Sequence, residues 1–302
     1  MSGDNEGTSC CASCGIAEID DIKLKDCDDC DLVKYCSDEC RENHKSQHKK
    51  ECKKRAAELR DELLFKQPDS SHLGDCPICS LPLSPDPSKS SMYNCCSKVI
   101  CKGCVYANAK REIEMRLQQS CPFCREALPK TDEECGKQRM KRLEVNDPVA
   151  ITAEGVKQNQ KGDYQSAFEY FTKAVELGYA EAHYRLSIFY RDGDGVEKNK
   201  GKEIHHLEEA AIRGHPLARY CLGAHEWETG KKERAVKHWI IAATQGDDYS
   251  IKQLMRAFKD GFVRKDDLAS ALRAHKAAVD ETKSPQREAA EKYYRQSINS
   301  AS

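Results

Sequence analysis

The N-terminal part of the chain contains the pattern CASC-x12-CDDC-x5-CSDEC-x7-HKKEC, from Cys11 to Cys52, which determines how this part folds. Its eight thiol and imidazole groups form four pairs. A C-x2-C pair lets two thiolates converge on one ion, and C-x3-C or H-x3-C is expected to place both ligands on one helical face. Four pairs fill two tetrahedral sites, and these soft ligands favour zinc over magnesium or calcium. The alternative for a single C-x2-C pair, a redox dithiol, needs a thioredoxin-like βαβ context that is missing here.

The same stretch closely resembles the MYND finger, both in Tyr35 directly before Cys36 and in the H-x3-C ending. The resemblance implies binding of short, often proline-containing peptides without chemistry. It also implies two interleaved zinc sites, with ligands Cys11, Cys14, Cys36 and Cys40 in one and Cys27, Cys30, His48 and Cys52 in the other. Cys10 is an alternative first ligand, but the C-x2-C spacing favours Cys11; His44 fits less well than His48.

A second group of eight thiols follows, in the order CPIC (76–79), Cys95-Cys96, CKGC (101–104) and CPFC (121–124). It resembles an all-cysteine RING finger, in which Lys98 takes the place of the usual histidine and the adjacent Cys95 and Cys96 compensate. The resemblance implies cross-braced zinc sites, with ligands Cys76, Cys79, Cys101 and Cys104 in one and Cys95, Cys96, Cys121 and Cys124 in the other. Zinc supplies the folding energy that so small a module cannot gain by burial.

The RING resemblance implies contact with a ubiquitin-conjugating enzyme through Ile78, Pro122 and Phe123. Arg125 follows the last ligand, at the position of the cation that holds ubiquitin in its reactive pose. Asn108 departs from the family, in which this helix position is often Trp; Tyr106 is an alternative aromatic residue. The composition of 105–119 predicts the single RING helix. Such a ligase works without a protein nucleophile, by holding donor and acceptor together.

Composition separates this cysteine-rich part from the rest of the chain. Sixteen of the 18 cysteines lie between Cys10 and Cys124, and 49 basic against 50 acidic residues give a net charge of −1. The balance disfavours nucleic-acid or anionic-membrane binding. The start MSGDNEGTSC lacks a secretory signal, and no apolar stretch approaches the roughly 18 residues of a membrane span. A cytoplasmic or nuclear location is expected, where thiols bind metal rather than form disulfides.

The C-terminal half contains a repeated pattern. AVELG (174–178), AAIRG (210–214) and AATQG (242–246) end successive helical stretches, and their glycines suit left-handed helix ends. The spacing between these glycines, from 178 to 214 and from 214 to 246, is typical of stacked helix pairs. It predicts four units, over 147–177, 178–213, 214–245 and 246–281. The segment 190–219, with its Gly-x-Gly-Val loop and Ala-Ala-x-x-Gly ending, resembles Sel-one-like repeats, relatives of tetratricopeptide repeats. The side chains expected between the helices are Tyr184, Leu186, Tyr190, Leu207 and Trp239.

Several other patterns are given the plainer interpretation. Asp192, Asp194 and Glu203 have the spacing of a calcium-binding loop, but Val196 and Glu197 break its pattern, so a loop between helices is favoured. His205-His206 is expected on a solvated helix face. The basic stretch 48–55 is expected to be a solvated helix end, and Cys135 and Cys221 to be thiols without a catalytic base.

The predicted fold class is two small zinc-stabilised modules, with short helices and little other regular structure, followed by an all-α helical-repeat solenoid. By residue number we expect a flexible tail (1–9), a MYND-type finger (10–54), a helical linker (55–70), a RING-type finger (71–130), a charged linker (131–146), about four repeats (147–283), and a C-terminal helix and tail (284–302).

Two functions fit this organisation. The first is a zinc-binding RING-type ubiquitin-protein ligase with four zinc ions, which selects protein substrates through the MYND finger and the repeats. The second is a non-enzymatic adaptor made of three interaction modules. Ile78 and Arg125 favour the first, and Asn108 opposes it. Nucleic-acid binding is disfavoured because basic and aromatic residues are not interleaved.

Overall fold

The computed structural model describes residues 9–299, with side chains as far as Gln296. The expected N-terminal tail therefore lies outside the described residues except for Ser9, as do residues 300–302 of the C-terminal tail. The chain divides into two compact units, Met1–Lys66 and Gln67–Ser302. None of the helices in the described part is long and apolar enough to cross a membrane.

The first unit has little regular structure before its one long helix. Strands β1 (Lys25–Asp26) and β2 (Lys34–Tyr35) pair antiparallel, with Lys25 opposite Tyr35. The small core of this unit consists of Cys11, Leu24 and Tyr35, which are all buried. So little apolar burial leaves most of the stabilisation to another source, as expected for a metal-dependent module.

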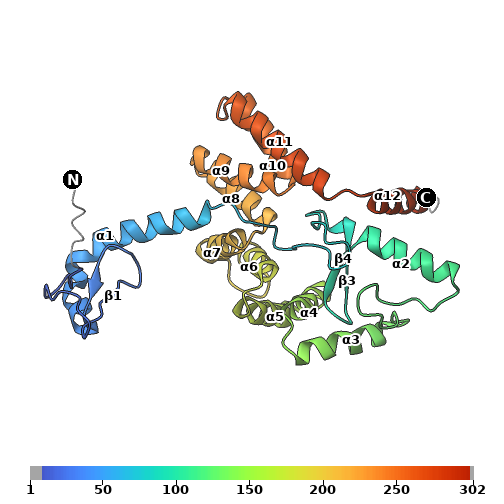
Figure 1. Cartoon of the computed structure of the whole chain (residues 1–302), viewed down its shortest axis with the longest axis horizontal. Coiled ribbons are helices and arrows are strands. Elements are labelled where there is room, and N and C mark those ends of the chain that lie inside the picture. The colour runs from blue at the N-terminus through green and yellow to red at the C-terminus, as the bar shows by residue number, and fades with distance from the viewer. Residues whose placement is uncertain (1–8, 300–302) are drawn as a thin grey trace. The chain divides into compact units, whose positions relative to one another are not determined.

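Helix α1 (Asp38–Leu64) follows β2 directly and is longer than the sequence pattern predicts (Figure 1). Ser37 caps it by accepting a hydrogen bond from the Cys40 amide at 3.2 Å, so Cys36 lies before the helix. The expectation that Cys36 and Cys40 share a helical face is wrong for this reason. The segment after Cys52 continues the same helix instead of forming a separate linker helix.

The second unit begins with the second cysteine-rich segment. A short 3-10 helix, η1 (Pro87–Lys89), leads into strands β3 (Ser90–Tyr93) and β4 (Lys98–Cys101), which pair antiparallel. Helix α2 (Lys102–Glu114) follows at once. It therefore starts three residues before the expected 105–119 helix and ends five residues before its end, because Arg116 adopts a left-handed φ of 53°.

Helix α3 (Asp132–Glu144) occupies the segment that was expected to be a charged linker. Thr131 and Glu134 occupy the positions of a capping box. Thr131 Oγ1 accepts from the Glu134 amide at 3.2 Å, and Glu134 accepts from the amide of Lys130, the residue before the N-cap, at 2.6 Å. Acidic residues in the first turn and basic residues in the last turn complement the helix dipole. Arg139 joins α3 to the next helix through Glu154 at 2.5 Å.

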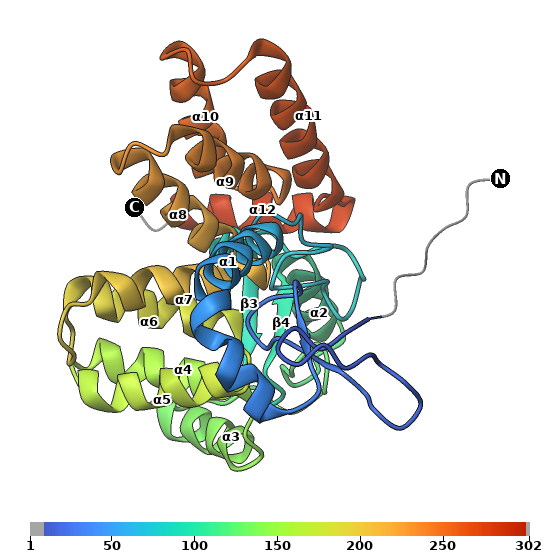
Figure 2. The same cartoon turned by 90° about the vertical axis from the view of Figure 1, so that its left-hand side faces the viewer.

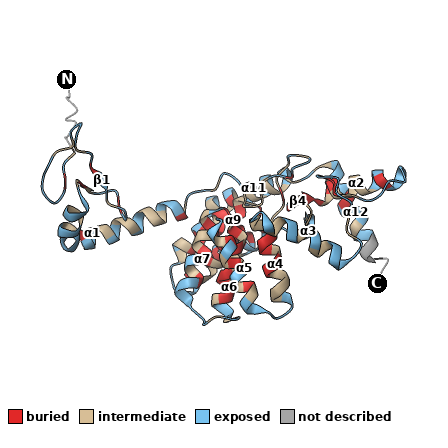
Figure 3. Ribbon diagram, turned by 90° about the horizontal axis from the view of Figure 1, so that it is seen from below, coloured by how far each residue is buried: buried red, intermediate tan, exposed pale blue. Residues whose placement is uncertain are grey.

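Eight helices then stack as four consecutive pairs, which we call the helical array (Figure 2). Their bounds are α4 Pro148–Gln160, α5 Tyr164–Glu176, α6 Ala180–Asp192, α7 Lys200–Ile212, α8 Pro216–Glu228, α9 Lys232–Thr244, α10 Asp248–Lys259 and α11 Lys265–Glu281. The expected left-handed glycines are confirmed, since φ is 76° at Gly178, 81° at Gly214 and 84° at Gly246. Buried residues concentrate in the interior of the array (Figure 3).

The layers between these helices are filled largely as predicted. Leu186, Leu207 and Trp239 are buried, and Tyr184 and Tyr190 are half-buried. At Gly223 a Cβ atom would lie only 2.4 Å from Nε1 of Trp239, so this helical position has no room for a side chain.

Two of the plainer interpretations can be checked here. The calcium-like loop is a connection between α6 and α7, and Glu203 lies in α7 with its carboxylate 3.0 Å from Lys200. His205 is exposed as expected, but the same expectation for His206 is wrong. The His206 ring stacks on Tyr190 with a 5.6 Å centroid distance, and its Nδ1 lies 3.1 Å from that of His183.

Helix α12 (Pro285–Asn299) ends the described chain. The expected cap is confirmed, because the Arg287 amide donates to Ser284 Oγ at 3.2 Å. The helix packs against α2, which lies more than 170 residues earlier in the chain (Figure 1).

Candidate metal centres and the adjoining surface

The structure brings the sixteen predicted ligands together in four groups, and within each group all ligand atoms lie within 4.8 Å of one another. The groups are Cys11, Cys14, Cys36 and Cys40; Cys27, Cys30, His48 and Cys52; Cys76, Cys79, Cys101 and Cys104; and Cys95, Cys96, Cys121 and Cys124. Each group joins two ligand pairs that are not neighbours in sequence, so the pairs interleave within both cysteine-rich segments.

The distances inside the first two groups fit a tetrahedral ion. Cys14 Sγ lies 3.5 Å from Cys36 Sγ, and Cys27 Sγ lies 3.8 Å from Cys52 Sγ. Zn–S bonds of about 2.3 Å place tetrahedral sulfurs roughly 3.8 Å apart, whereas a disulfide holds them about 2.05 Å apart. His48 completes its group with Nε2 at 3.2 Å from the Cys30 sulfur.

The third and fourth groups have the same dimensions. Cys79 Sγ lies 3.8 Å from Cys101 Sγ in the third group. In the fourth, Cys124 Sγ lies 3.4 Å from Cys95 Sγ, and Cys96 Sγ lies 3.8 Å from Cys121 Sγ. The adjacent residues Cys95 and Cys96 therefore both reach one group, as a ligand pair must.

Hydrogen bonds between thiols of one group lower the pKa of one partner and raise that of the other. A hydrogen bond from Cys101, supported by backbone amides, lowers the pKa of Cys76 to about 4 although burial opposes this, and the same bond raises the pKa of Cys101. Burial also opposes deprotonation of Cys11, yet amides of Cys14, Cys36 and Ser13 lower its pKa to about 6. Thiolate is the form that binds metal. The donor sets and their spacing are therefore consistent with zinc at all four groups.

The residues that compete for ligand roles lie outside these groups. Cys10 is exposed and takes part in an isolated bridge with Ala17. His44 supports the site from outside: its Nδ1 lies 3.1 Å from the Tyr35 hydroxyl, and its ring stacks on that of His48 at 5.8 Å.

A fifth group, which the sequence analysis missed, lies in the second unit. His72, Glu181 and His215 approach one another within the same 4.8 Å limit. His215 Nδ1 accepts the Ala218 amide at 3.3 Å, so its proton lies on Nε2, which donates to Glu181 at 2.9 Å. A metal would need that same nitrogen unprotonated. This group is therefore a hydrogen-bonded cluster that anchors the segment around His72, whose ring stacks on His215 at 4.1 Å.

Two exposed apolar side chains adjoin the third and fourth groups. Ile78, between the ligands of CPIC, is 42% exposed, and Phe123, between the ligands of CPFC, is 43% exposed. Pro122 was also expected to contact the conjugating enzyme, but it is buried, so this expectation is wrong for Pro122. Lys98 Nζ lies 5.9 Å from the centre of the Phe123 ring.

A network of hydrogen bonds links Arg125 to residues of α2. Arg125 Nη1 donates to Asn108 Oδ1 at 2.8 Å, and Asn108 Nδ2 donates to the Ser120 carbonyl at 3.3 Å. Ser120 in turn donates from its hydroxyl to the buried Glu112 at 2.6 Å. Burial opposes ionisation of Glu112, but hydrogen bonds from Ser120 and Asn108 lower the pKa of its carboxyl. Tyr106 takes no part in these hydrogen bonds. Its ring packs on that of Tyr293 in α12, with a centroid distance of 5.0 Å.

Comparison with known families supports the two ends of this architecture. The MYND finger model matches residues 11–52, and the Sel1 repeat model matches 153–179, 180–215 and 218–247. The chain carries a MYND finger and Sel1 repeats. The MYND match includes every member of the first two ligand groups and implies zinc, and the Sel1 matches fall on α4 to α9. Both modules imply protein partners.

The curated relatives each cover part of the chain. It is 35% identical over 60 residues to the "Putative RING finger protein ORF96" of Ostreid herpesvirus 1, 20% of this chain and 25% of that protein. It is 29% identical over 133 residues to "Protein SHC1" of Saccharomyces cerevisiae, 39% of this chain and 26% of that protein. The chain thus spans about a quarter of the length of these relatives.

Among solved structures, the chain is similar to a Sel1 repeat protein from Oxalobacter formigenes. The identity is 27% and the TM-score 0.43, with 50% of this chain and 65% of that chain covered. A second similar structure is the c5321 antigen of uropathogenic Escherichia coli, at 24% identity and a TM-score of 0.42, with coverages of 49% and 34%.

Proposed function

We propose that residues 71–130 form a RING-type module and that the protein is a ubiquitin-protein ligase. The observation that carries the proposal is the exposed apolar pair Ile78 and Phe123, held on two loops by separate ligand groups. Exposed apolar side chains on loops fixed by metal ligands form the kind of small surface on which a few residues dominate binding energy. The similarity over 60 residues to the protein named "Putative RING finger protein ORF96" supports the same assignment.

Four zinc ions would serve as structural cofactors here, with the four groups as their ligands. Bound zinc holds the loops and supplies folding energy. The chain's own residues then perform the function: Ile78 and Phe123 bind the ubiquitin-conjugating enzyme, and Arg125 donates hydrogen bonds that orient the ubiquitin it carries. The gain in rate comes from proximity and orientation, since no nucleophile of this chain takes part.

The other two modules would select the protein that receives ubiquitin. A MYND finger and a helical array both imply protein partners, and they lie on either side of the RING-type module in sequence. Ligands of the MYND finger are expected to be short, often proline-containing peptides. The array would contribute a longer surface for a folded or extended protein.

Discharge of ubiquitin from a loaded conjugating enzyme to free lysine tests the proposal. The full-length, zinc-loaded protein should accelerate discharge with at least one enzyme of a broad panel. Ile78→Ala should remove most of the acceleration because it deletes an anchor of a small interface. Met92→Ala is the matched control: Met92 is also apolar and 38% exposed, but lies on β3 outside both ligand loops. A zinc-loaded protein that accelerates discharge with no enzyme of the panel contradicts the ligase assignment.

A non-enzymatic adaptor is the second candidate, and Asn108 is the observation that favours it. This helix position offers the conjugating enzyme an amide already engaged by Arg125 rather than an aromatic ring. In the adaptor the zinc modules and the array would bind protein partners without ubiquitin transfer. The two candidates separate in the discharge assay, since only the ligase depends on Ile78 there.

A further inference from the structure

Helix α12 is built into the second cysteine-rich segment rather than merely lying beside it. Gly103 of α2 has no room for a side chain, because a Cβ atom there would lie 2.7 Å from Cγ and 3.0 Å from Cα of Arg287. Gln286 donates to the Gly103 carbonyl at 3.0 Å, and Ala290 is fully buried. Tyr293 extends the contact to Tyr106. The two helices therefore approach as closely as their backbones allow at this glycine.

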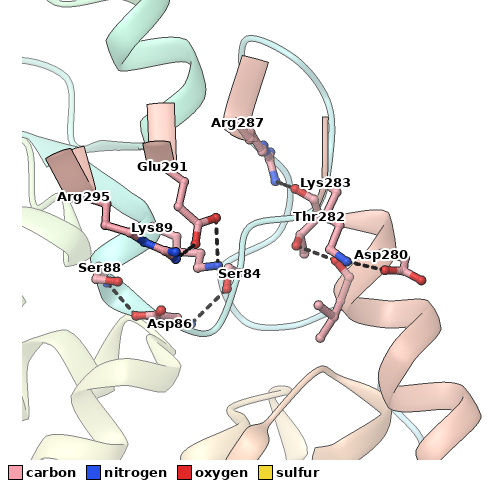
Figure 4. Close-up of polar contacts among 11 residues, drawn as sticks. Ser84, Asp86, Ser88, Lys89, Asp280, Thr282, Lys283, Arg287, Glu291 and Arg295 are labelled. Atoms are coloured by element: carbon pink, nitrogen blue, oxygen red, sulfur yellow. Dashed lines mark hydrogen bonds and ion pairs between the residues drawn. The ribbon is translucent and has the colours of Figure 1, made fainter. Parts of the chain in front are cut away.

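The guanidinium of Arg287 lies in the loop that follows the first two ligands of the third group. Its Nη1 donates to the Pro82 carbonyl at 2.7 Å, and its Nη2 donates to the Leu81 carbonyl at 3.1 Å. Nη2 also lies 3.3 Å from the sulfur of Cys79, a member of that group. A further bond from Nη1 to the Thr282 carbonyl, at 2.8 Å, fixes the side chain at the start of α12 (Figure 4).

These contacts are those expected of an outer-sphere partner of a metal ligand. A zinc ion bound by four thiolates carries net negative charge, which a nearby guanidinium offsets. Arginine keeps its charge at all relevant pH values and presents several donors in a fixed plane, so one side chain serves the sulfur and two carbonyls at once. Partners of this kind change metal affinity by about 10- to 100-fold.

We propose that Arg287 secures zinc at the third group, so that metal retention by this cysteine-rich segment depends on the C-terminal helix. The proposal does not require the ligase activity, because it concerns the Cys79 thiolate and the 79–82 loop alone. Arg287 lies more than 200 positions after Cys79 in the sequence. Under this proposal it supplies a part of the surroundings of the third zinc ion that the CPIC motif does not supply.

Zinc release from the full-length protein to a chromophoric chelator tests this proposal. In the Arg287→Met variant, one of the four zinc ions should leave about 10- to 100-fold faster than in the original protein, while the other three keep their rates. Arg287→Lys keeps the charge but loses the planar fork, so its fast ion should leave at an intermediate rate. After replacement of zinc by ¹¹³Cd, the NMR signal of one all-cysteine site should shift in both variants.

A matched variant separates this role from simple docking of the helix. Tyr293→Ala weakens the contact with Tyr106 but leaves the guanidinium and Cys79 untouched. It should lower thermal stability while zinc at the third group leaves at close to the original rate. Equal acceleration by Tyr293→Ala and Arg287→Met would show that helix docking alone matters and would overturn the proposal. Unchanged release in a folded Arg287→Lys or Arg287→Met protein would overturn it as well.

Discussion

Arg125 and Asn108 are joined by a 2.8 Å hydrogen bond from guanidinium to side-chain amide. Asn108 is the residue at which the sequence departs from the RING pattern, and Arg125 is the residue expected to hold ubiquitin. Because Asn108 also donates to the Ser120 carbonyl, its amide has a fixed orientation. In the proposed ligase this bond would support Arg125, although the same departure leaves the conjugating enzyme without an aromatic ring at position 108.

Replacement of Asn108 by alanine should therefore lower the rate of ubiquitin discharge without weakening binding of the conjugating enzyme. A hydrogen bond to a charged group contributes about 1.5 to 3 kcal/mol. Because Arg125 is partly solvated, we expect the lower end of this range, which corresponds to a roughly tenfold lower rate. Discharge kinetics and a binding isotherm measure the two effects separately. Lys110→Ala, on the exposed side of the same helix, should change neither quantity. A faster Asn108→Ala protein would mean that the bond restrains Arg125 in an unproductive pose.

The ligand assignment leads to a prediction at two adjacent thiols. Cys11→Ser should lower the zinc content from four ions to three, because it removes a buried member of the first group. Cys10→Ser should retain four, since Cys10 is exposed and lies outside the group. Native mass spectrometry in reducing buffer counts the ions in each protein. Loss of a zinc ion from the Cys10→Ser protein alone would make Cys10 the first ligand in place of Cys11. Two zinc ions in the original protein would show that one of the two cysteine-rich segments does not bind zinc as assigned.

The four ligand groups were predictable because their information is local. A pair separated by two or three residues has few ways to bind a metal, and the order of the pairs supports the interleaved pattern by resemblance. Helix α3 was also readable in principle, from the capping box at Thr131 and Glu134. Charge alone obscured it, because alternating acidic and basic residues fit both a linker and a solvated helix.

The docking of α12 had no comparable local signal. Its contacts join Arg287 and Gln286 to residues around Cys79 and Gly103, more than 180 positions earlier. Gly103 between two ligands was the one visible trace, and a glycine there fits a tight turn between ligands equally well. The partial burial of His206 was missed for a similar reason: Tyr190 and His183, which contact it, belong to the preceding helix.

Removal of zinc should leave the helical array folded. The two tryptophans of the chain, Trp227 and Trp239, both lie in the array, so tryptophan emission reports on this part alone. Excess EDTA should strip the cysteine-rich segments while the emission maximum stays constant, because apolar layers rather than thiolates stabilise the array. A red shift on chelation, in a protein whose zinc loss is verified, would contradict the independence of the array from the metal.

Acidification should weaken the array through His238, which is fully buried in α9. Burial, together with the nearby Arg219 and Arg234, lowers the pKa of His238 to about 3, although Glu226 lies 3.6 Å away. The unfolded chain takes up this proton near pH 6.5, whereas the folded chain does so only near 3. Between these values the unfolded state binds more protons, so the free energy of unfolding falls as pH falls.

The slope from this one group cannot exceed about 1.4 kcal/mol per pH unit. Urea unfolding followed by tryptophan emission between pH 7.5 and 5.5 measures it above the range in which carboxylates titrate. His238→Gln should reduce the slope without abolishing it, since glutamine occupies a similar volume and gains no charge, while burial also lowers the pKa of His183 and His206 to about 4. An equal slope in the original and His238→Gln proteins would show that the buried His238 imidazole does not contribute to the acid sensitivity of the array.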